Sequence, residues 1–191
     1  MKKSLLCCLA IVGTSVAALA NQLSPVIDTD TPKAEFNPTA SQVVDHKTGL
    51  TWQRCLVGQH YLNNQCSGSA TLAQSWEEAL AIAQQAGNDW RLPTIKELSS
   101  IADNSRVQPA LNTDVFRFTN QLSYPVQDRW DRDHQNPALW SATPVITAKG
   151  SSFYRSYAWD IAQGISMPVK RDDGKAYQLK AQYVLLVKNS Q

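Results

Sequence analysis

The sequence predicts one small domain in which two helices pack against mostly antiparallel strands. Three observations predict it: two helix-start motifs near the middle of the chain, short segments of alternating polarity on both sides of them, and one pair of cysteines that can close a loop. No internal repeat, low-complexity tract or second domain interrupts this pattern.

The first residues predict a cleaved export signal over residues 1–20. Lys2 and Lys3 precede an uncharged, mostly apolar run, Leu5 to Leu19, which is too short to span a bilayer. Ala18-Leu19-Ala20 supplies the small residues of a signal-peptidase site, so cleavage is expected before Asn21, and a retained anchor is the alternative. We therefore expect a mature chain without a transmembrane segment, located in the periplasm, on the outer surface or in the medium.

The charge of the mature chain disfavours nucleic acid as a partner. The whole chain carries 18 lysine and arginine residues against 16 aspartate and glutamate residues, so the loss of Lys2 and Lys3 brings the formal charge to zero. A neutral protein has no overall basic field, and polyanion binding would need a local patch of arginines.

The cysteines predict a disulfide between Cys55 and Cys66. Cys7 and Cys8 belong to the predicted signal, and an even remainder in an exported protein is typical of a disulfide. A zinc site is disfavoured because no third ligand is nearby, and a redox pair is more often spaced Cys-x-x-Cys.

The chain before the domain is expected to be flexible. Residues 21–41 contain three prolines among polar residues and few large apolar groups, which predicts a flexible tail, followed by a folded domain over residues 42–191. Two short strands are predicted at the start of that domain, at 43–45 and 50–54, joined by a turn with Gly49.

Two helices follow, each with a capping box. Ser75-Trp76-Glu77-Glu78 starts the first, which places Ala79, Leu80, Ala83 and Ala86 on one side and ends at Gly87. Thr94-Ile95-Lys96-Glu97 starts the second. Beyond residue 105 prolines punctuate an irregular region with an exposed polar loop at 127–136, and strands are predicted at 153–161, 164–169 and 183–187.

These segments together resemble the Lcl C-terminal domain family, also called DUF1566, which includes the C-terminal domain of a collagen-like adhesin. The sharpest match is Trp90-Arg91-Leu92-Pro93-Thr94-Ile95-Lys96-Glu97-Leu98. The other matching pieces run from Asp45 to Cys55, then Gly58-Gln59, Cys66-Ser67-Gly68, Ser75 to Ala79, Trp140 to Thr143, and Ala158-Trp159-Asp160 with Gly164.

The resemblance implies an α+β domain similar to C-type-lectin-like and sulfatase-modifying-factor-like folds. In the collagen-like adhesin the domain is associated with glycosaminoglycan binding and attachment. The chain departs from many relatives at its end, where Tyr183-Val184-Leu185-Leu186-Val187-Lys188 lacks an arginine and a cysteine, and no collagenous tract precedes the domain. These departures weaken the expectation that this chain binds polyanions as the adhesin domain does.

The motif residues have an adequate structural explanation. Trp90 and Leu92 bury area, Pro93 ends an extended segment, and Arg91 needs an acceptor, for which Glu97 and Asp160 are the candidates. The same structural role is expected for the remaining family positions, Trp52, Trp76, Trp140, Trp159 and Gly164.

We expect no catalytic activity and no bound cofactor. Ser141 lies in no nucleophile-elbow motif, and no histidine is tied to it by spacing. His46, His60 and His134 lie scattered in polar contexts and form no zinc motif, so surface positions are expected for them.

The polar loop carries two ligand hypotheses beside the simpler one of a solvated loop. Asp128, Asp131 and Asp133 could bind calcium, although the glycine and closing glutamate of a calcium loop are absent. Arginines and a tryptophan could instead bind an anionic sugar: Arg129, Trp130, Arg132 and Arg155, with Arg117, Lys170 and Arg171 as further candidates.

The favoured function is an exported recognition domain, adhesion-like, that binds a glycan, an envelope polymer or a protein partner. The alternative is a structural or assembly subunit of an envelope apparatus such as a pilus. A periplasmic enzyme is the least favoured. The sequence indicates no oligomeric state.

Overall fold

The computed structural model describes residues 28–122, 137–145, 154–170 and 182–190. Its strands are β1 (Phe36–Pro38), β2 (Gln42–Asp45), β3 (Leu50–Gln53), β4 (His60–Leu62), β5 (Gln65–Ser67), β6 (Leu72–Ala73), β7 (Ala138–Pro144), β8 (Tyr154–Asp160), β9 (Ile165–Lys170), β10 (Gln182–Tyr183) and β11 (Val187–Asn189). Its helices are α2 (Trp76–Ala86) and α3 (Ile95–Ser100), with 3-10 turns η1 (Lys33–Glu35) and η2 (Arg117–Gln121). The described part is therefore α+β, as predicted.

A four-stranded antiparallel sheet holds the first strands in the order β1-β2-β3-β11. The predicted turn between β2 and β3 is confirmed. Buried Asp45 closes it, because its carboxylate accepts the backbone N–H groups of Lys47 and Thr48 at 2.9 and 3.2 Å. Gly49 then takes a φ of +70°, which glycine adopts at little cost.

The prediction of a flexible tail up to residue 41 is wrong from Asp28 onward. Strand β1 forms an edge of the four-stranded sheet, and Phe36 is buried with its ring 5.8 Å from that of Phe116. The Thr29 hydroxyl donates to the Asp103 carboxylate at 2.7 Å, and the Asn112 amide donates to the Thr31 carbonyl at 2.8 Å. The proline-rich composition concealed these anchors because they join residues far apart in sequence.

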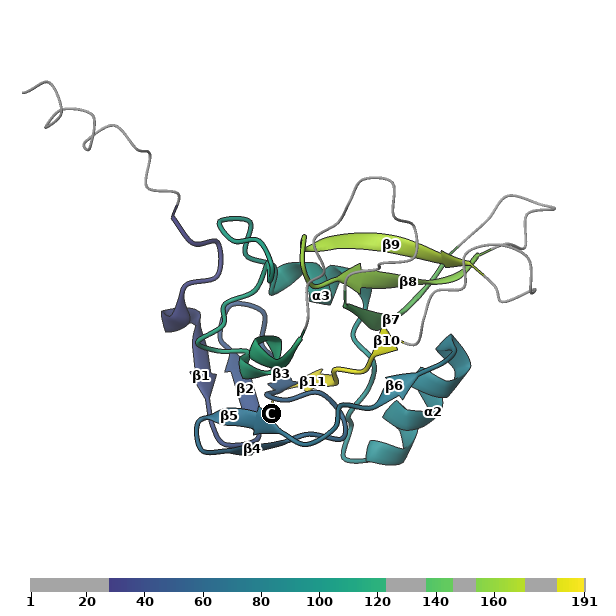
Figure 1. Ribbon diagram of the computed structural model, residues 1–191, viewed down its shortest axis with the longest axis horizontal. Helices are drawn as coiled ribbons and strands as arrows, with labels where there is room; N and C mark the ends of the chain where they lie inside the picture. Colours follow the sequence, from purple (N-terminus) through teal and green to yellow (C-terminus); the bar gives the residue numbers. More distant parts are fainter. Residues whose placement is uncertain (1–27, 123–136, 146–153, 171–181, 191) are drawn as a thin grey trace, which may run out of the picture.

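A second sheet has five strands in the order β6-β10-β7-β8-β9. All its pairings are antiparallel except that of β10 with β7, so the prediction of mostly antiparallel strands is confirmed. Helix α3 packs against β7, β8 and β9, and α2 packs beside β6 and β7 (Figure 1). The β4–β5 hairpin forms a separate two-stranded sheet.

The predicted terminal strand at 183–187 is two strands in different sheets. Tyr183 belongs to β10 in the five-stranded sheet, whereas Val187 belongs to β11 in the four-stranded sheet. Between them Val184 to Leu186 are fully buried, and the carbonyls of Val184 and Leu186 accept backbone N–H groups of Val57 and Gln53. Figure 1 shows this yellow segment running from one sheet to the other. An apolar run alone does not indicate that the chain passes from one sheet to another.

Both predicted helix starts are present, with one difference. At α3 the capping box is complete, since Thr94 and Glu97 cap each other. At α2 the Ser75 hydroxyl accepts the Glu78 N–H at 3.1 Å, but the Glu78 carboxylate accepts the N–H of Gln74 rather than that of Ser75. Gly87 ends α2, as predicted.

Two apolar clusters form the interior. The larger lies between the four-stranded sheet, α3 and η2, and centres on Phe116, whose ring makes edge contacts with Phe36, Trp52 and Phe118. The smaller lies beneath α2 and contains Ala79, Ala83, Leu92, Trp140 and Leu186. The second cluster shares Ala83 and Leu92 with a groove between α2 and the segment that follows it.

Candidate binding groove

The Trp90–Pro93 segment is fixed against the C-terminal strand. Arg91 exchanges two backbone hydrogen bonds of 3.0 Å with Val187 of β11, and Leu92 is buried. The Lys188 ammonium lies 4.9 Å from the centre of the Trp90 ring, within the range of a cation–π contact. The segment therefore has a set position relative to β11.

The Arg91 side chain is held by Glu97. Its Nη1 and Nη2 donate to the two carboxylate oxygens of Glu97 at 2.8 and 2.7 Å, a bidentate pair, and the same carboxylate accepts the N–H of Thr94 at 2.7 Å. Glu97 was one of two predicted partners. Asp160, the other, accepts backbone N–H groups of the turn that follows it.

This pair changes the acid–base behaviour of both groups. Burial alone would raise the pKa of Glu97, but hydrogen bonds from Arg91 and Thr94, together with the charge of Arg91, outweigh it and lower that pKa. The hydrogen bond to Glu97 raises the pKa of Arg91 against the effect of burial. Both groups therefore stay charged at neutral pH.

Helix α2 faces this segment with the apolar side chains that the sequence places on one side of it. Ala79 and Ala83 are buried as expected, but Leu80 is 37% exposed. The first residue of α2, Trp76, ties the helix to β7, because its indole N–H donates to the Ser141 carbonyl at 2.9 Å. A stripe of apolar side chains on α2 thus extends from the core to the surface.

A groove of about 430 Å³ lies between α2 and the Trp90–Thr94 segment. Its lining is mostly apolar and consists of Leu80, Ala83, Gln84, Trp90, Arg91, Leu92, Thr94 and Ala142. The polar groups of Arg91 and Thr94 are already engaged by Glu97. The groove therefore offers mostly carbon surface, with the Gln84 amide and the Trp90 indole N–H as its main uncommitted hydrogen-bonding groups.

A cation lies over the ring of Trp90, one of the lining residues of the groove. Lys188 covers the Trp90 ring, and within the described ranges no carboxylate lies within 4.0 Å of its ammonium, although exposed Asp89 precedes Trp90 in sequence. Arg91, by contrast, is neutralised by Glu97. Among the described residues of this region, Lys188 is therefore the cation that no carboxylate neutralises.

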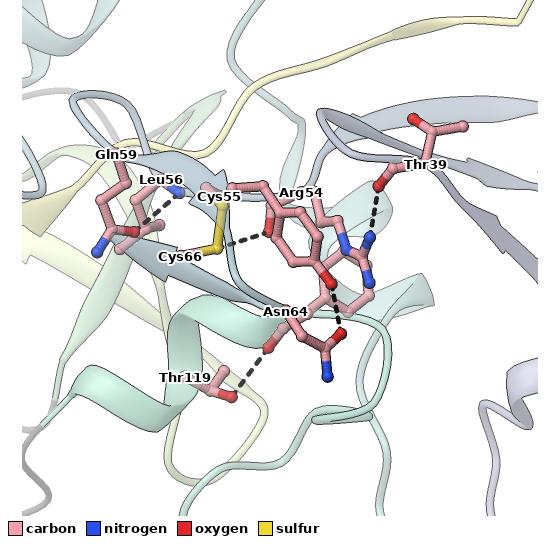
Figure 2. The surroundings of a disulfide bond; sticks show 10 residues. Thr39, Arg54, Cys55, Leu56, Gln59, Asn64, Cys66 and Thr119 are labelled. Carbon is pink, nitrogen blue, oxygen red and sulfur yellow. Dashed lines mark hydrogen bonds between the residues drawn. A yellow bond between two sulfur atoms is a disulfide. The ribbon is translucent and has the colours of Figure 1, made fainter. Parts of the chain in front are cut away.

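The predicted Cys55–Cys66 disulfide is confirmed, with an S–S distance of 2.04 Å (Figure 2). Both cysteines are buried, and the bond ties the end of β3 to the β4–β5 hairpin. Its neighbour Arg54 packs on the Tyr61 ring at 3.8 Å and donates to the Thr39 carbonyl. Burial lowers the pKa of Arg54; Tyr61 opposes this shift, and the charge of Arg117 adds to it.

The other motif residues lie in the interior. Trp52 and Trp159 are fully buried, their indole N–H groups have no hydrogen-bond partner among the described residues, and both rings pack in the larger apolar cluster. Trp140 donates to the Ala73 carbonyl at 3.1 Å. Gly164 has a φ of +69°, and a Cβ there would lie 3.0 Å from the Ala110 Cβ. At these positions the side chains pack within the fold, in keeping with the structural role expected for them.

The residues weighed for catalysis are engaged or exposed. The buried Ser141 hydroxyl donates to the Tyr157 carbonyl at 2.6 Å. His46 and His60 are at the surface, as predicted, whereas His134 lies outside the described residues. Within the described ranges no group of three potential metal ligands forms, and no helix is long and apolar enough to cross a membrane.

The predicted ligand residues of the polar loop lie outside the described residues. These are Asp128, Arg129, Trp130, Asp131, Arg132 and Asp133. Arg171 and the predicted export signal over 1–20 also lie outside the described residues. Arg155 and Lys170 lie on β8 and β9, with side chains outside the description. Arg117 is described, and its Nη2 lies 3.5 Å from the Asp114 carboxylate. Sequence reasoning missed the groove, because its walls meet only in the folded chain.

The chain belongs to the Lcl C-terminal domain family, whose model matches residues 41–188. The family is adhesin-like and is not a known enzyme family, which suggests a recognition domain at the surface or otherwise exported. Comparison with curated proteins and with solved structures found no match.

Proposed function

We propose that this chain is an exported, non-enzymatic recognition domain and that its groove binds an apolar side chain of a protein partner. The mostly apolar lining between α2 and the Trp90–Thr94 segment carries this proposal. Family membership supports the recognition class. We further propose that the fold is related to C-type-lectin-like and sulfatase-modifying-factor-like domains.

A protein side chain suits this groove better than a sugar. A glycan brings hydroxyl groups, and each one buried without a hydrogen-bond partner costs about 1–3 kcal/mol. The polar lining groups of Arg91 and Thr94 are engaged by Glu97, and Leu80 and Ala142 present only carbon. The Gln84 amide and the Trp90 indole N–H are therefore the main groups left to pair with sugar hydroxyls. An apolar side chain needs no such partners, and its full burial contributes about 1.5–3 kcal/mol.

The glycan, calcium and assembly hypotheses are kept as alternatives. Glycan binding would depend on Arg129, Trp130, Arg132 and Arg155, and calcium binding on the three aspartates of the same loop. An assembly subunit of an envelope apparatus would use the groove as a permanent contact between subunits. These alternatives predict different behaviour in one binding experiment.

The test is retention of the purified protein on an immobilised envelope extract from its host. We expect retention that disappears after protease treatment of the extract and falls roughly tenfold in Leu80→Ser, which removes an apolar wall of the groove. Leu62→Ser is the matched control, because Leu62 is 52% exposed on the β4–β5 hairpin and does not line the groove.

Other results would point to the alternatives. Retention on heparin that falls with salt, weakens in Arg129→Glu and is unchanged in Leu80→Ser would overturn the proposal in favour of a glycan. Retention that requires added calcium would favour a calcium site at the three aspartates of the polar loop. A stable complex of fixed composition during purification would favour the assembly subunit.

A further inference from the structure

The inference that follows rests on the proposed function and names the chemistry of the partner. We infer that the groove accepts an apolar side chain that is followed or preceded by a carboxylate, and that Lys188 meets this carboxylate. The partner is thus an acidic peptide segment with an aliphatic or aromatic anchor. The inference comes from the position of Lys188 relative to the groove wall.

Strand pairing holds Lys188 beside the wall of the groove. In β11 Lys188 lies opposite Thr51, and its neighbour Val187 bonds to the backbone of Arg91 in the groove wall. The ammonium is seated over Trp90, itself a lining residue. The cation therefore lies beside one wall residue of the groove, and this neighbourhood is the basis for assigning it to a charged group of the ligand.

Among the described residues near the Trp90 ring, Lys188 is the cation without a carboxylate partner, and exposed Asp89 is the carboxylate without a cationic partner. Arg91 is engaged bidentately by Glu97, so its charge is compensated. Lys188 has no carboxylate within 4.0 Å in the described ranges, and its nearest ring is an uncharged indole. A cationic residue beside the apolar anchor would meet repulsion there, whereas an anionic residue would be attracted.

The expected selectivity is modest because the site is open to water. An exposed pair of opposite charges contributes about 0.2–1 kcal/mol, which corresponds to a change in affinity of up to about fivefold. The apolar anchor supplies the larger share of the affinity, and the charge decides between partners that carry the same anchor.

The experiment is an NMR titration of the ¹⁵N-labelled protein with three capped dipeptides: Ac-Asp-Phe-NH₂, Ac-Lys-Phe-NH₂ and Ac-Asp-Ala-NH₂. Shifts are followed at the Trp90 indole, assigned with a Trp90→Phe variant, and at the amides of Leu80 and Gln84. We expect Asp-Phe to bind about two- to fivefold more tightly than Lys-Phe, and Asp-Ala to cause no shift at these groups.

Matched lysine variants separate this inference from the proposed function. Lys188→Gln should abolish the preference for Asp-Phe, while Lys96→Gln, an exposed lysine on α3, should retain it, because Lys188 and not Lys96 is seated on the Trp90 ring. Equal binding of the two phenylalanine peptides, or an unchanged preference in Lys188→Gln, would overturn the role of Lys188 and leave the apolar groove standing. If neither phenylalanine peptide shifts the groove signals, both the inference and the groove assignment fail.

Discussion

The guanidinium of Arg91 and the carboxylate of Glu97 face each other across the first turn of α3 through two hydrogen bonds of 2.8 and 2.7 Å. The same carboxylate completes the capping box with Thr94. One side chain therefore fixes both the start of a helix and the wall of the groove.

Loss of the Glu97 charge should destabilise the domain. Glu97→Gln keeps the shape of the side chain but cannot accept both Arg91 donors, and we expect a loss of about 1–2 kcal/mol in the free energy of unfolding, measured by urea denaturation. Lys96→Gln, on an exposed position of the same helix, should change it by less than about 0.5 kcal/mol. Equal stability of the two variants would show that the pair contributes nothing.

Acid should destabilise the protein through two carboxylates. Burial would raise the pKa of Asp103, but hydrogen bonds from Ser105 and Thr29 outweigh it, so the pKa of Asp103 lies below its ordinary value, as does that of Glu97. A carboxylate with a lowered folded-state pKa stabilises the fold above its unfolded value of about 4, and this contribution is lost as the pH falls further.

The corresponding measurement is the melting temperature between pH 7 and pH 2. We expect a plateau down to about pH 5 and a decline below about pH 4, with a shallower decline in Glu97→Gln. A Glu97→Gln variant as acid-sensitive as the parent would contradict the assignment for this carboxylate. The Asp103 side chain is fully buried, so Asp103→Asn should also make the fall in melting temperature shallower. A fall as steep as that of the parent would contradict the assignment for Asp103.

Removal of the disulfide should lower stability without exposing a new function. The Cys55→Ser, Cys66→Ser double variant loses a crosslink over 11 residues, which in the chain-entropy account contributes roughly 3 kcal/mol. For a domain of this size, a loss of that order lowers the melting temperature by roughly 6–12 °C. A melting temperature equal to that of the parent would mean that packing around the hairpin suffices.

Two glycines with similar backbones should respond differently to alanine. Gly58 and Gly49 have φ values of +88° and +70°, but a Cβ at Gly58 would lie 2.5 Å from the Ser69 carbonyl, whereas nothing lies within 4 Å of one at Gly49. Gly49→Ala should cost about 1 kcal/mol from the backbone alone, and Gly58→Ala a further 1–3 kcal/mol from the clash. Chemical denaturation of both variants measures the difference, and equal losses would exclude a steric contribution.

Local chemistry allowed the sequence to predict the helices, the β2–β3 turn and the disulfide. Ser75, Thr94, Gly87 and Gly49 act on backbone groups within a few residues, so their effect can be recognised without knowledge of the fold. The disulfide needed only the count of cysteines and the expected compartment.

The remaining features depend on contacts between distant segments. The anchoring of Thr29 by Asp103 and the exposure of Leu80 could not be inferred from periodicity, since each depends on which segment packs alongside. The groove needs α2, the Trp90–Thr94 segment and Ala142 to meet, and the charge at its rim needs Lys188 to lie over Trp90. Sequence reasoning placed ligand residues in the polar loop because composition was its only guide there.

The crossing of Val184–Leu186 between the sheets has a consequence for biogenesis. Because β11 completes a sheet begun by β1, β2 and β3, a ribosome must have made nearly all of the chain before either sheet can close. Synthesis of residues 182–189, which carry β10 and β11, is therefore the step that completes both sheets and joins one to the other.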